Sequence, residues 1–323
     1  MGKPCTERAA VSAAFFCLWL SGCASFDTRI PDTWEARVEL QEIPFYSQQA
    51  HHCGPAALLT VLDASGVSPR YDQVVERVYV PGLEGSLQVE LMAAARGFER
   101  IPFRLAGELV PVLSEINAGR PVLILQNLRL PGLPAWHYAV VVGYDRERAE
   151  ILMRSGNEPL QRTPVRRWMR QWDWASRWAI VVLAPGELPV NPNRPAVLRA
   201  LVDFDDQAPA GSRLLAWQSV AVQWPDESLA WIGKGNARFE LGELEGAAED
   251  FAHALVLMPE SWPARLNLVQ VLLMLDRPGD ARRIFNAQPI GCDHPLFDVH
   301  ARLQDRLVAA GGQLSSLPEA GCR

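Results

Sequence analysis

The chain has 323 residues, more than a single hydrophobic core normally supports, so its length favours two domains. Hydrophobic residues make up 49% of the sequence and charged residues 21%, a composition that excludes extensive disorder, collagen and coiled coil. The formal net charge is −6 and no long run of Lys or Arg occurs, so a nucleic-acid partner is not expected. Six cysteines in a chain of this length are too few for a disulfide scaffold, so each needs its own explanation.

The first 22 residues have the pattern of a bacterial export signal. Two basic residues precede an apolar stretch over residues 9–20, which is too short to span a bilayer. The following Leu20-Ser21-Gly22-Cys23 resembles a lipobox, which implies cleavage before Cys23, acylation of that residue and an anchor and tether over residues 23–37. Residue 24 is Ala, and the Asp of an inner-membrane retention signal is absent, so we expect attachment to the periplasmic face of the outer membrane. The alternative is a plain secretory signal with an incidental Cys.

Processing of this signal simplifies the cysteine count. Cys5 and Cys17 would leave with the signal and Cys23 would be consumed by lipid, which leaves three thiols in an oxidising compartment. Cys292 and Cys322 both lie near the C-terminus and are predicted to form a disulfide. Cys53 is then the odd thiol.

Residues 38–184 combine helical and strand patterns. Apolar periodicity and Gly or Pro boundaries predict three helices followed by four strands. The helices are expected over 53–62, 87–95 and 109–118, and the strands over 121–125, 138–143, 149–153 and 178–183. Helices followed by antiparallel strands predict an α+β domain.

A linker rich in Pro and Asn over residues 185–195 separates this domain from a purely helical region, 196–323. Counted from Ser228, seven positions resemble a tetratricopeptide unit in one register: Trp231, Gly235, Gly242, Ala247, Phe251, Ala254 and Pro259. The resemblance implies an all-α domain of stacked helix pairs with a concave face for a protein partner. Unrelated amphipathic helices are the alternative.

Cys53 stands at the start of the first predicted helix. Free N–H groups and the helix dipole favour a thiolate at such a position, so we expect a lowered pKa for Cys53. Gln48, five residues upstream, could place its amide beside the Cys53 N–H as a second oxyanion donor. His51 and His52 suggest a metal site, but neighbouring residues at a helix start point in different directions and do not make a tetrahedral site.

A nucleophilic thiol needs a base, and His137 is the candidate, because it precedes the apolar strand that begins at Tyr138. The next strand should return antiparallel and bring residues 154–156 opposite His137. We therefore expect Ser155 or Asn157 to orient the imidazole.

These motifs resemble the bacteriocin-processing, double-glycine leader peptidases, which are papain-like cysteine peptidases. The resemblance covers about residues 40–184 and rests on Gln48, on the run from Cys53 to Leu58, and on His137 with its Val-rich strand. It implies that Cys53 is the nucleophile, His137 the general base and acid, and Gln48 the oxyanion donor, without metal or organic cofactor. The family usually has Asp followed by Pro on the returning strand, where this chain has Ser155 and Gly156. A neutral residue stabilises imidazolium less than a carboxylate does.

The sequence thus predicts a papain-like α+β peptidase domain followed by an all-α, tetratricopeptide-like domain. The predicted function is that of a lipid-anchored periplasmic thiol peptidase, which hydrolyses a peptide bond in a peptide or protein through a thioester. The alternative is a catalytically degenerate fold that acts as a peptide-binding or envelope-assembly adaptor through its helical repeats. The Asp-Cys-Ser-Gly box of papain-like cell-wall amidases is absent.

Overall fold

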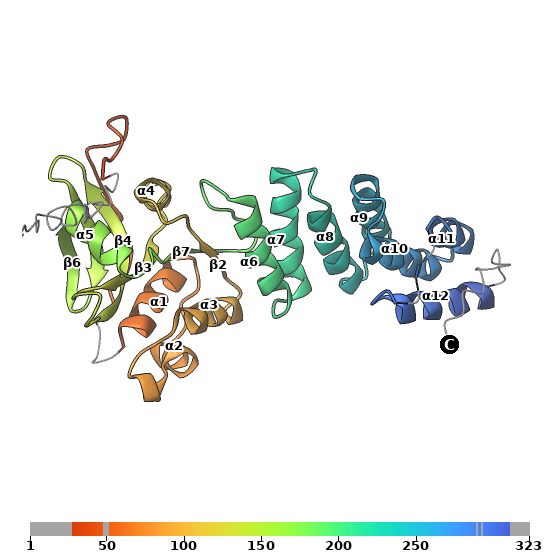
Figure 1. The fold of residues 1–323 in the computed structure, drawn as a ribbon, viewed down its shortest axis with the longest axis horizontal. Coiled ribbons are helices and arrows are strands. Elements are labelled where there is room, and N and C mark those ends of the chain that lie inside the picture. Colours follow the sequence, from red (N-terminus) through yellow and green to blue (C-terminus); the bar gives the residue numbers. More distant parts are fainter. Residues whose placement is uncertain (1–27, 48–51, 289, 292, 311–323) are drawn as a thin grey trace, which may run out of the picture.

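The computed structural model describes residues 28–47, 52–288, 290–291 and 293–310. A sheet domain with covering helices lies at one end of an elongated molecule, and a row of helices extends from it (Figure 1). Among the residues singled out above, Cys23, Gln48, His51, Cys292 and Cys322 lie outside the described residues, so what was expected of them stays a prediction. No helix in the described part of the chain is long and apolar enough to cross a bilayer.

Within the described residues, seven strands form one sheet in which all neighbouring strands are antiparallel. Six of them follow the order β2-β7-β3-β4-β5-β6, and β1 pairs with the far end of β4. Their bounds are β1 Arg37–Glu39, β2 Ile101–Arg104, β3 Val122–Asn127, β4 Trp136–Asp145, β5 Glu150–Ser155, β6 Glu158–Pro164 and β7 Ala179–Leu183.

Helices cover both faces of the sheet. Apolar residues alternate along the strands, so that Leu123 and Leu125 share a core with α1, α2 and α3, while Val122 and Ile124 share another with α4, α5 and α6. The bounds are α1 Cys53–Ala64, α2 Tyr71–Val78, α3 Gln88–Gly97, α4 Leu109–Asn117, α5 Val165–Asp173 and α6 Arg194–Asp205, with a short 3-10 helix at Pro81–Leu83. The expected antiparallel sheet with helices is confirmed, and the sequence analysis missed β1, α2, β2, β6 and α5.

The C-terminal region is helical from α6 to α12, and each helix packs on the next one along the chain. The further bounds are α7 Ala210–Gln223, α8 Ser228–Glu240, α9 Leu244–Leu257, α10 Trp262–Met274, α11 Pro278–Phe285 and α12 Phe297–Ala309. Glycines allow close packing: a Cβ on Gly233 would lie 2.3 Å from the Trp217 ring, and one on Gly235 would lie 2.6 Å from Phe251. We call this region the helical array.

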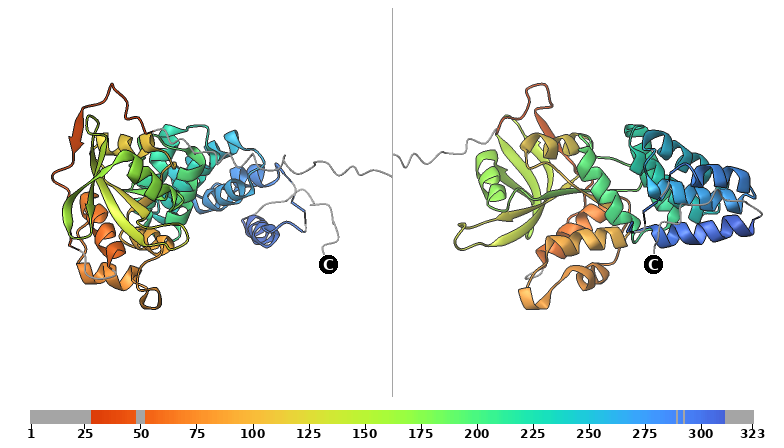
Figure 2. Two further views of the ribbon diagram at one scale, coloured as in Figure 1. Left: turned by 60° about the vertical axis from the view of Figure 1, so that its left-hand side comes forward. Right: turned by 45° about the vertical axis from the view of Figure 1, so that its right-hand side comes forward.

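The sheet domain and the helical array share one hydrophobic core. The cluster that contains Ile101 and Phe103 of β2 continues through Leu201 and Phe204 of α6 to Trp217 of α7. Figure 2 shows α6 and α7 between the sheet and the rest of the array in both views. The first helices of the array therefore stabilise the sheet domain as well as the array.

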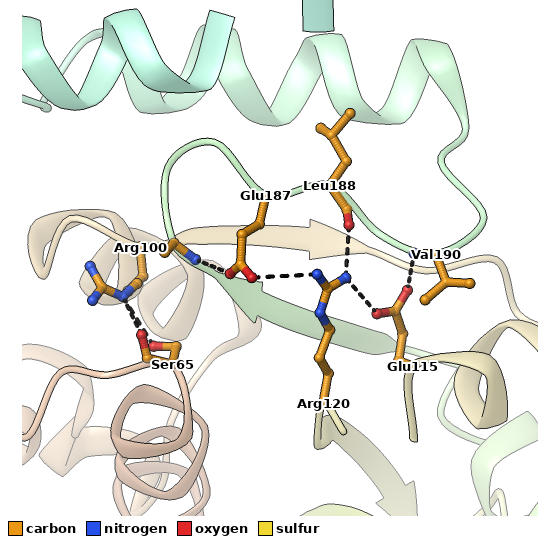
Figure 3. Close-up of polar contacts among 8 residues, drawn as sticks. Ser65, Arg100, Glu115, Arg120, Glu187, Leu188 and Val190 are labelled. Carbon is orange, nitrogen blue, oxygen red and sulfur yellow. Dashed lines mark hydrogen bonds and ion pairs between the residues drawn. The ribbon is translucent and has the colours of Figure 1, made fainter. Parts of the chain in front are cut away.

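Polar contacts fasten the segment between the two regions to the sheet domain (Figure 3). The Glu115 carboxylate, which is 1% exposed, accepts a hydrogen bond of 2.7 Å from the Val190 N–H and lies 3.5 Å from the Arg120 guanidinium. Arg120 also donates to the Leu188 carbonyl at 2.8 Å and contacts Glu187 at 3.4 Å. These contacts hold residues 187–190 against α4 and the residues that precede β3.

We expect Glu115→Ala to lower the free energy of unfolding by about 3 kcal/mol, because it leaves the Val190 N–H without its acceptor and removes the buried one of the two carboxylates that contact Arg120. Glu115→Gln keeps an acceptor for Val190 and should cost about 1 kcal/mol. Urea denaturation followed by tryptophan fluorescence measures both. Equal losses for the two variants would contradict a role for the carboxylate as a hydrogen-bond acceptor.

Candidate functional site

Cys53 is the first residue of α1 and is partly exposed. The start of this helix approaches the loop before α3 so closely that a Cβ on Gly54 would lie 2.6 Å from the Ser86 Cβ. The same Cβ would be 3.6 Å from the Tyr138 ring on β4. Glycine after Cys53 therefore lets the helix N-terminus sit between the Ser86 loop and the sheet.

Burial raises the pKa of the Cys53 thiol above its ordinary value. The backbone N–H groups of Tyr138, Gly54 and Cys53 favour the thiolate, but their effect on the pKa is smaller than that of desolvation. The expectation of a lowered pKa, drawn from the helix start and from a nearby His137, was wrong in direction. It omitted the low-dielectric surroundings that Tyr138 and the neighbouring helices create around the sulfur.

His137 lies near the start of β4, and its Nε2 is 2.9 Å from the Oγ of Ser155 at the end of β5. Ser155 is buried, so this hydrogen bond is shielded from water. Because Nε2 is bound to Ser155, Nδ1 is the ring nitrogen that can exchange a proton with another group. Burial lowers the pKa of His137, which favours the neutral imidazole.

The strand register differs from the one expected from the sequence. Val140, rather than His137, lies opposite Arg154, because the hairpin already pairs Asp145 with Glu150; a bulge between Val141 and Gly143 then shifts the pairing by one residue. The Ser155 side chain nevertheless reaches the His137 ring. Asn157, the other candidate for orienting the imidazole, instead accepts a hydrogen bond of 2.8 Å from Ser47.

Tyr138 joins the thiol to the histidine strand. Its backbone N–H is directed at the Cys53 sulfur, and it follows His137 directly in β4. Among the described residues, Ser155 is the hydrogen-bond partner of the His137 ring, and no hydrogen bond joins that ring to Cys53. Catalytic hydrogen bonds are often long in unliganded enzymes and shorten when substrate binds.

His52 has a packing role beside this site. Its Nδ1 lies 3.2 Å from the Tyr71 hydroxyl, and its ring packs edge-on against Tyr79 with centroids 4.9 Å apart. The His52 side chain therefore lies against Tyr71, the first residue of α2, and Tyr79, the residue that follows α2.

Two further residues beside the site were missed by the sequence analysis. Gln126 is 1% exposed, pairs with His137 across β3 and β4, and has no hydrogen-bond partner for its Nε2 among the described residues. Arg154 donates to the backbone carbonyls of Leu40 and Ile43 and so fastens the segment that leads to Cys53. Gln126 could have been recognised from the sequence as a polar residue at the end of an apolar strand. Nothing near Arg154 in the sequence indicated its contacts.

Comparisons with known proteins concern the sheet domain. Residues 40–181 match the Peptidase_C39 like family. A crystal structure of a presumed C39-like peptidase from Bacillus anthracis is also similar, with 17% sequence identity and a TM-score of 0.39. The match covers 46% of this chain and 98% of the other. A comparison with curated proteins gave no match. The sheet domain is therefore described below as the C39-like domain.

Proposed function

We propose that the C39-like domain is a papain-like thiol peptidase in which Cys53 is the nucleophile and His137 the general base. The observation that carries the proposal is the hydrogen bond of 2.9 Å between His137 Nε2 and the Oγ of buried Ser155, next to Tyr138, whose backbone N–H favours the Cys53 thiolate. A nucleophile, a base and a group that orients the base are the parts that acyl transfer requires.

The directions of the two pKa shifts define the resting state of this pair. A raised pKa for Cys53 and a lowered pKa for His137 favour a neutral thiol beside a neutral imidazole. In the proposed reaction His137 Nδ1 takes the thiol proton as Sγ attacks the substrate carbonyl, and the same proton then passes to the leaving amine. Water hydrolyses the thioester, with His137 again as base. The backbone N–H groups at the start of α1 and the predicted Gln48 amide would stabilise the oxyanion.

The pH dependence of alkylation tests this resting state. Since burial raises the pKa of Cys53, the rate of iodoacetamide modification should still be rising above pH 8.5, about the pKa of a free thiol. Mass spectrometry of the peptide containing Cys53 gives the rate at each pH. A plateau reached below pH 7 would instead indicate a thiolate–imidazolium pair and would contradict the neutral resting state.

A second candidate function is binding without cleavage. Ser155 supplies no negative charge to stabilise imidazolium, so turnover is expected to be slower than with an aspartate. The helical array also offers a place for a protein partner, in a cavity of about 320 Å³ lined by Arg213, Asn236 and Asn267 among others. Binding of a polypeptide with no cleavage by the wild-type protein would favour this adaptor function.

We further propose that the predicted lipid at Cys23 anchors the protein to the periplasmic face of the outer membrane. The proposal rests on the lipobox-like sequence alone. Cys23→Ser should move most of the protein from the membrane fraction to the soluble fraction or leave the signal uncleaved, as checked by fractionation and N-terminal mass analysis. Cys292→Ser, which leaves the lipobox intact, is the control, and unchanged partitioning of Cys23→Ser would contradict a lipid anchor.

A further inference from the structure

We propose that two exposed apolar loops next to Cys53 bind the substrate and select polypeptides with bulky apolar side chains beside the scissile bond. This inference rests on the proposed thiol peptidase function and adds a substrate preference to it. The residues that form the surface, here called the apolar rim, are Leu83, Leu87, Leu130, Leu133 and Trp136.

The first loop of the apolar rim contacts the start of α1. Ser86 packs against Gly54, the neighbour of Cys53, and its carbonyl accepts a hydrogen bond of 3.2 Å from the Tyr138 hydroxyl. Leu87 directly follows Ser86 in the chain, and Leu83 lies in the short 3-10 helix just before it. Both leucines are exposed, Leu83 by 59%. An exposed apolar pair therefore adjoins the helix end that carries the thiol.

The second loop joins β3 to β4 and ends next to His137. Asn127 is fully buried, and its Oδ1 accepts hydrogen bonds from the N–H groups of Arg129 at 3.1 Å and Ala135 at 3.0 Å. Its Nδ2 donates to the Leu130 carbonyl at 3.3 Å. A buried side chain thus fixes the path of this loop from the inside.

The fixed loop holds large apolar side chains in water. Leu130 is 64% exposed, Leu133 is 73% exposed, and Trp136 is 55% exposed. Pro131 and Pro134 restrict the backbone of the same loop, so little conformational entropy would be lost when it binds a partner. Several large apolar side chains on one ordered loop are typical of an interaction surface.

The position of Trp136 connects this surface to the thiol. Alternate residues of a strand share a face, so Trp136 lies on the same face of β4 as Tyr138, whose ring approaches Gly54 and whose N–H is directed at Cys53. Each loop therefore adjoins one member of the proposed catalytic pair, the first through Ser86 and Gly54 beside Cys53, the second through Trp136 beside His137. A polypeptide bound at Cys53 would have its neighbouring side chains over the apolar rim, which identifies the substrate as the occupant.

The test compares three peptidyl acyloxymethyl ketones, which alkylate an active-site thiol. They differ only in the two residues next to the ketone, which are Leu-Leu, Ser-Ser or Gly-Gly. Their second-order rates of Cys53 modification are measured on the full chain by mass spectrometry, with iodoacetamide as a probe of intrinsic thiol reactivity. We expect the Leu-Leu ketone to react at least about tenfold faster than the other two, the discrimination that a single apolar contact commonly gives. The double variant Leu130→Ser and Leu133→Ser should lose most of this preference and keep its iodoacetamide rate. Val256→Ser, which removes a comparably exposed apolar residue from α9, is the matched control.

Each outcome gives a distinct answer. Equal rates for the three ketones, or a preference that the double variant retains, would overturn the apolar rim as a specificity surface while leaving the peptidase function intact. Modification by iodoacetamide but by none of the ketones would overturn both proposals. If the double variant instead lost binding to vesicles of phosphatidylethanolamine and phosphatidylglycerol with its ketone preference unchanged, the rim would be assigned to a lipid surface and the substrate inference would be wrong.

Discussion

Replacement of His137 by alanine is expected to lower peptide hydrolysis by about 10²- to 10⁴-fold, the usual contribution of a positioned general acid–base group. Cys53→Ala should abolish hydrolysis, because no other thiol among the described residues can form the thioester. The measurement is cleavage of a defined peptide mixture followed by mass spectrometry. The size of the effect follows from the fixed position of His137, whose ring is held by Ser155.

The control for this experiment is His253→Ala. The His253 ring stacks on Trp231 in the helical array, with centroids 4.1 Å apart, and has no part in the proposed reaction. It should leave hydrolysis unchanged. If His137→Ala retained full activity while Cys53→Ala lost it, the base would have to be another residue, and the assignment of His137 would be wrong.

Introduction of a carboxylate at the orienting position should increase activity. Ser155→Asp places a negative charge next to His137 Nε2 in a buried site, so it should raise the pKa of His137 and, through the imidazolium that forms, lower that of Cys53. We expect about 10- to 100-fold faster alkylation of Cys53 at pH 7, and faster hydrolysis. This gain is smaller than the roughly 10⁴-fold that the triad aspartate contributes to the rate of serine proteases. The acid limb of the pH profile of alkylation should move to lower pH, because a lowered pKa of Cys53 lets the thiolate form at lower pH.

Asn157→Asp provides a matched control for added charge. Asn157 lies two residues from Ser155, is exposed, and hydrogen-bonds Ser47 rather than His137. A carboxylate there should change the alkylation rate far less. Comparable increases in both variants would show a general effect of charge on the thiol and would contradict a specific orienting role for position 155.

The order of the elements could be predicted from the sequence where the signal was local. The Ala- and Leu-rich run after Cys53 defined a helix start, and the β-branched run after Tyr138 defined a buried strand, because periodicity and Pro or Gly boundaries depend only on near neighbours. The same local signals identified Cys53, His137 and Ser155 as candidates. They were enough to predict an α+β domain with antiparallel strands and a helical region after it.

Long-range contacts decided what the sequence left open. The His137 ring hydrogen-bonds Ser155, whereas Asn157 accepts a hydrogen bond from Ser47, and these contacts depend on how β4 and β5 pair and where the Ser47 segment lies. The direction of the Cys53 pKa shift required the burial produced by Tyr138 and by helices distant in the chain. Gln126 became a neighbour of His137 only through the pairing of β3 with β4.

The sequence by itself therefore determined which residues are candidates for the chemistry and where the helices and strands with strong local patterns lie, since residue type and local periodicity are properties of the chain. Only the tertiary structure decided the protonation state that the site favours, the residue that orients the histidine, and the shared core that joins the C39-like domain to the helical array. The physical reason is that desolvation, cross-strand hydrogen bonding and apolar packing depend on groups far apart in sequence, whose positions are set when the sheet and its covering helices assemble.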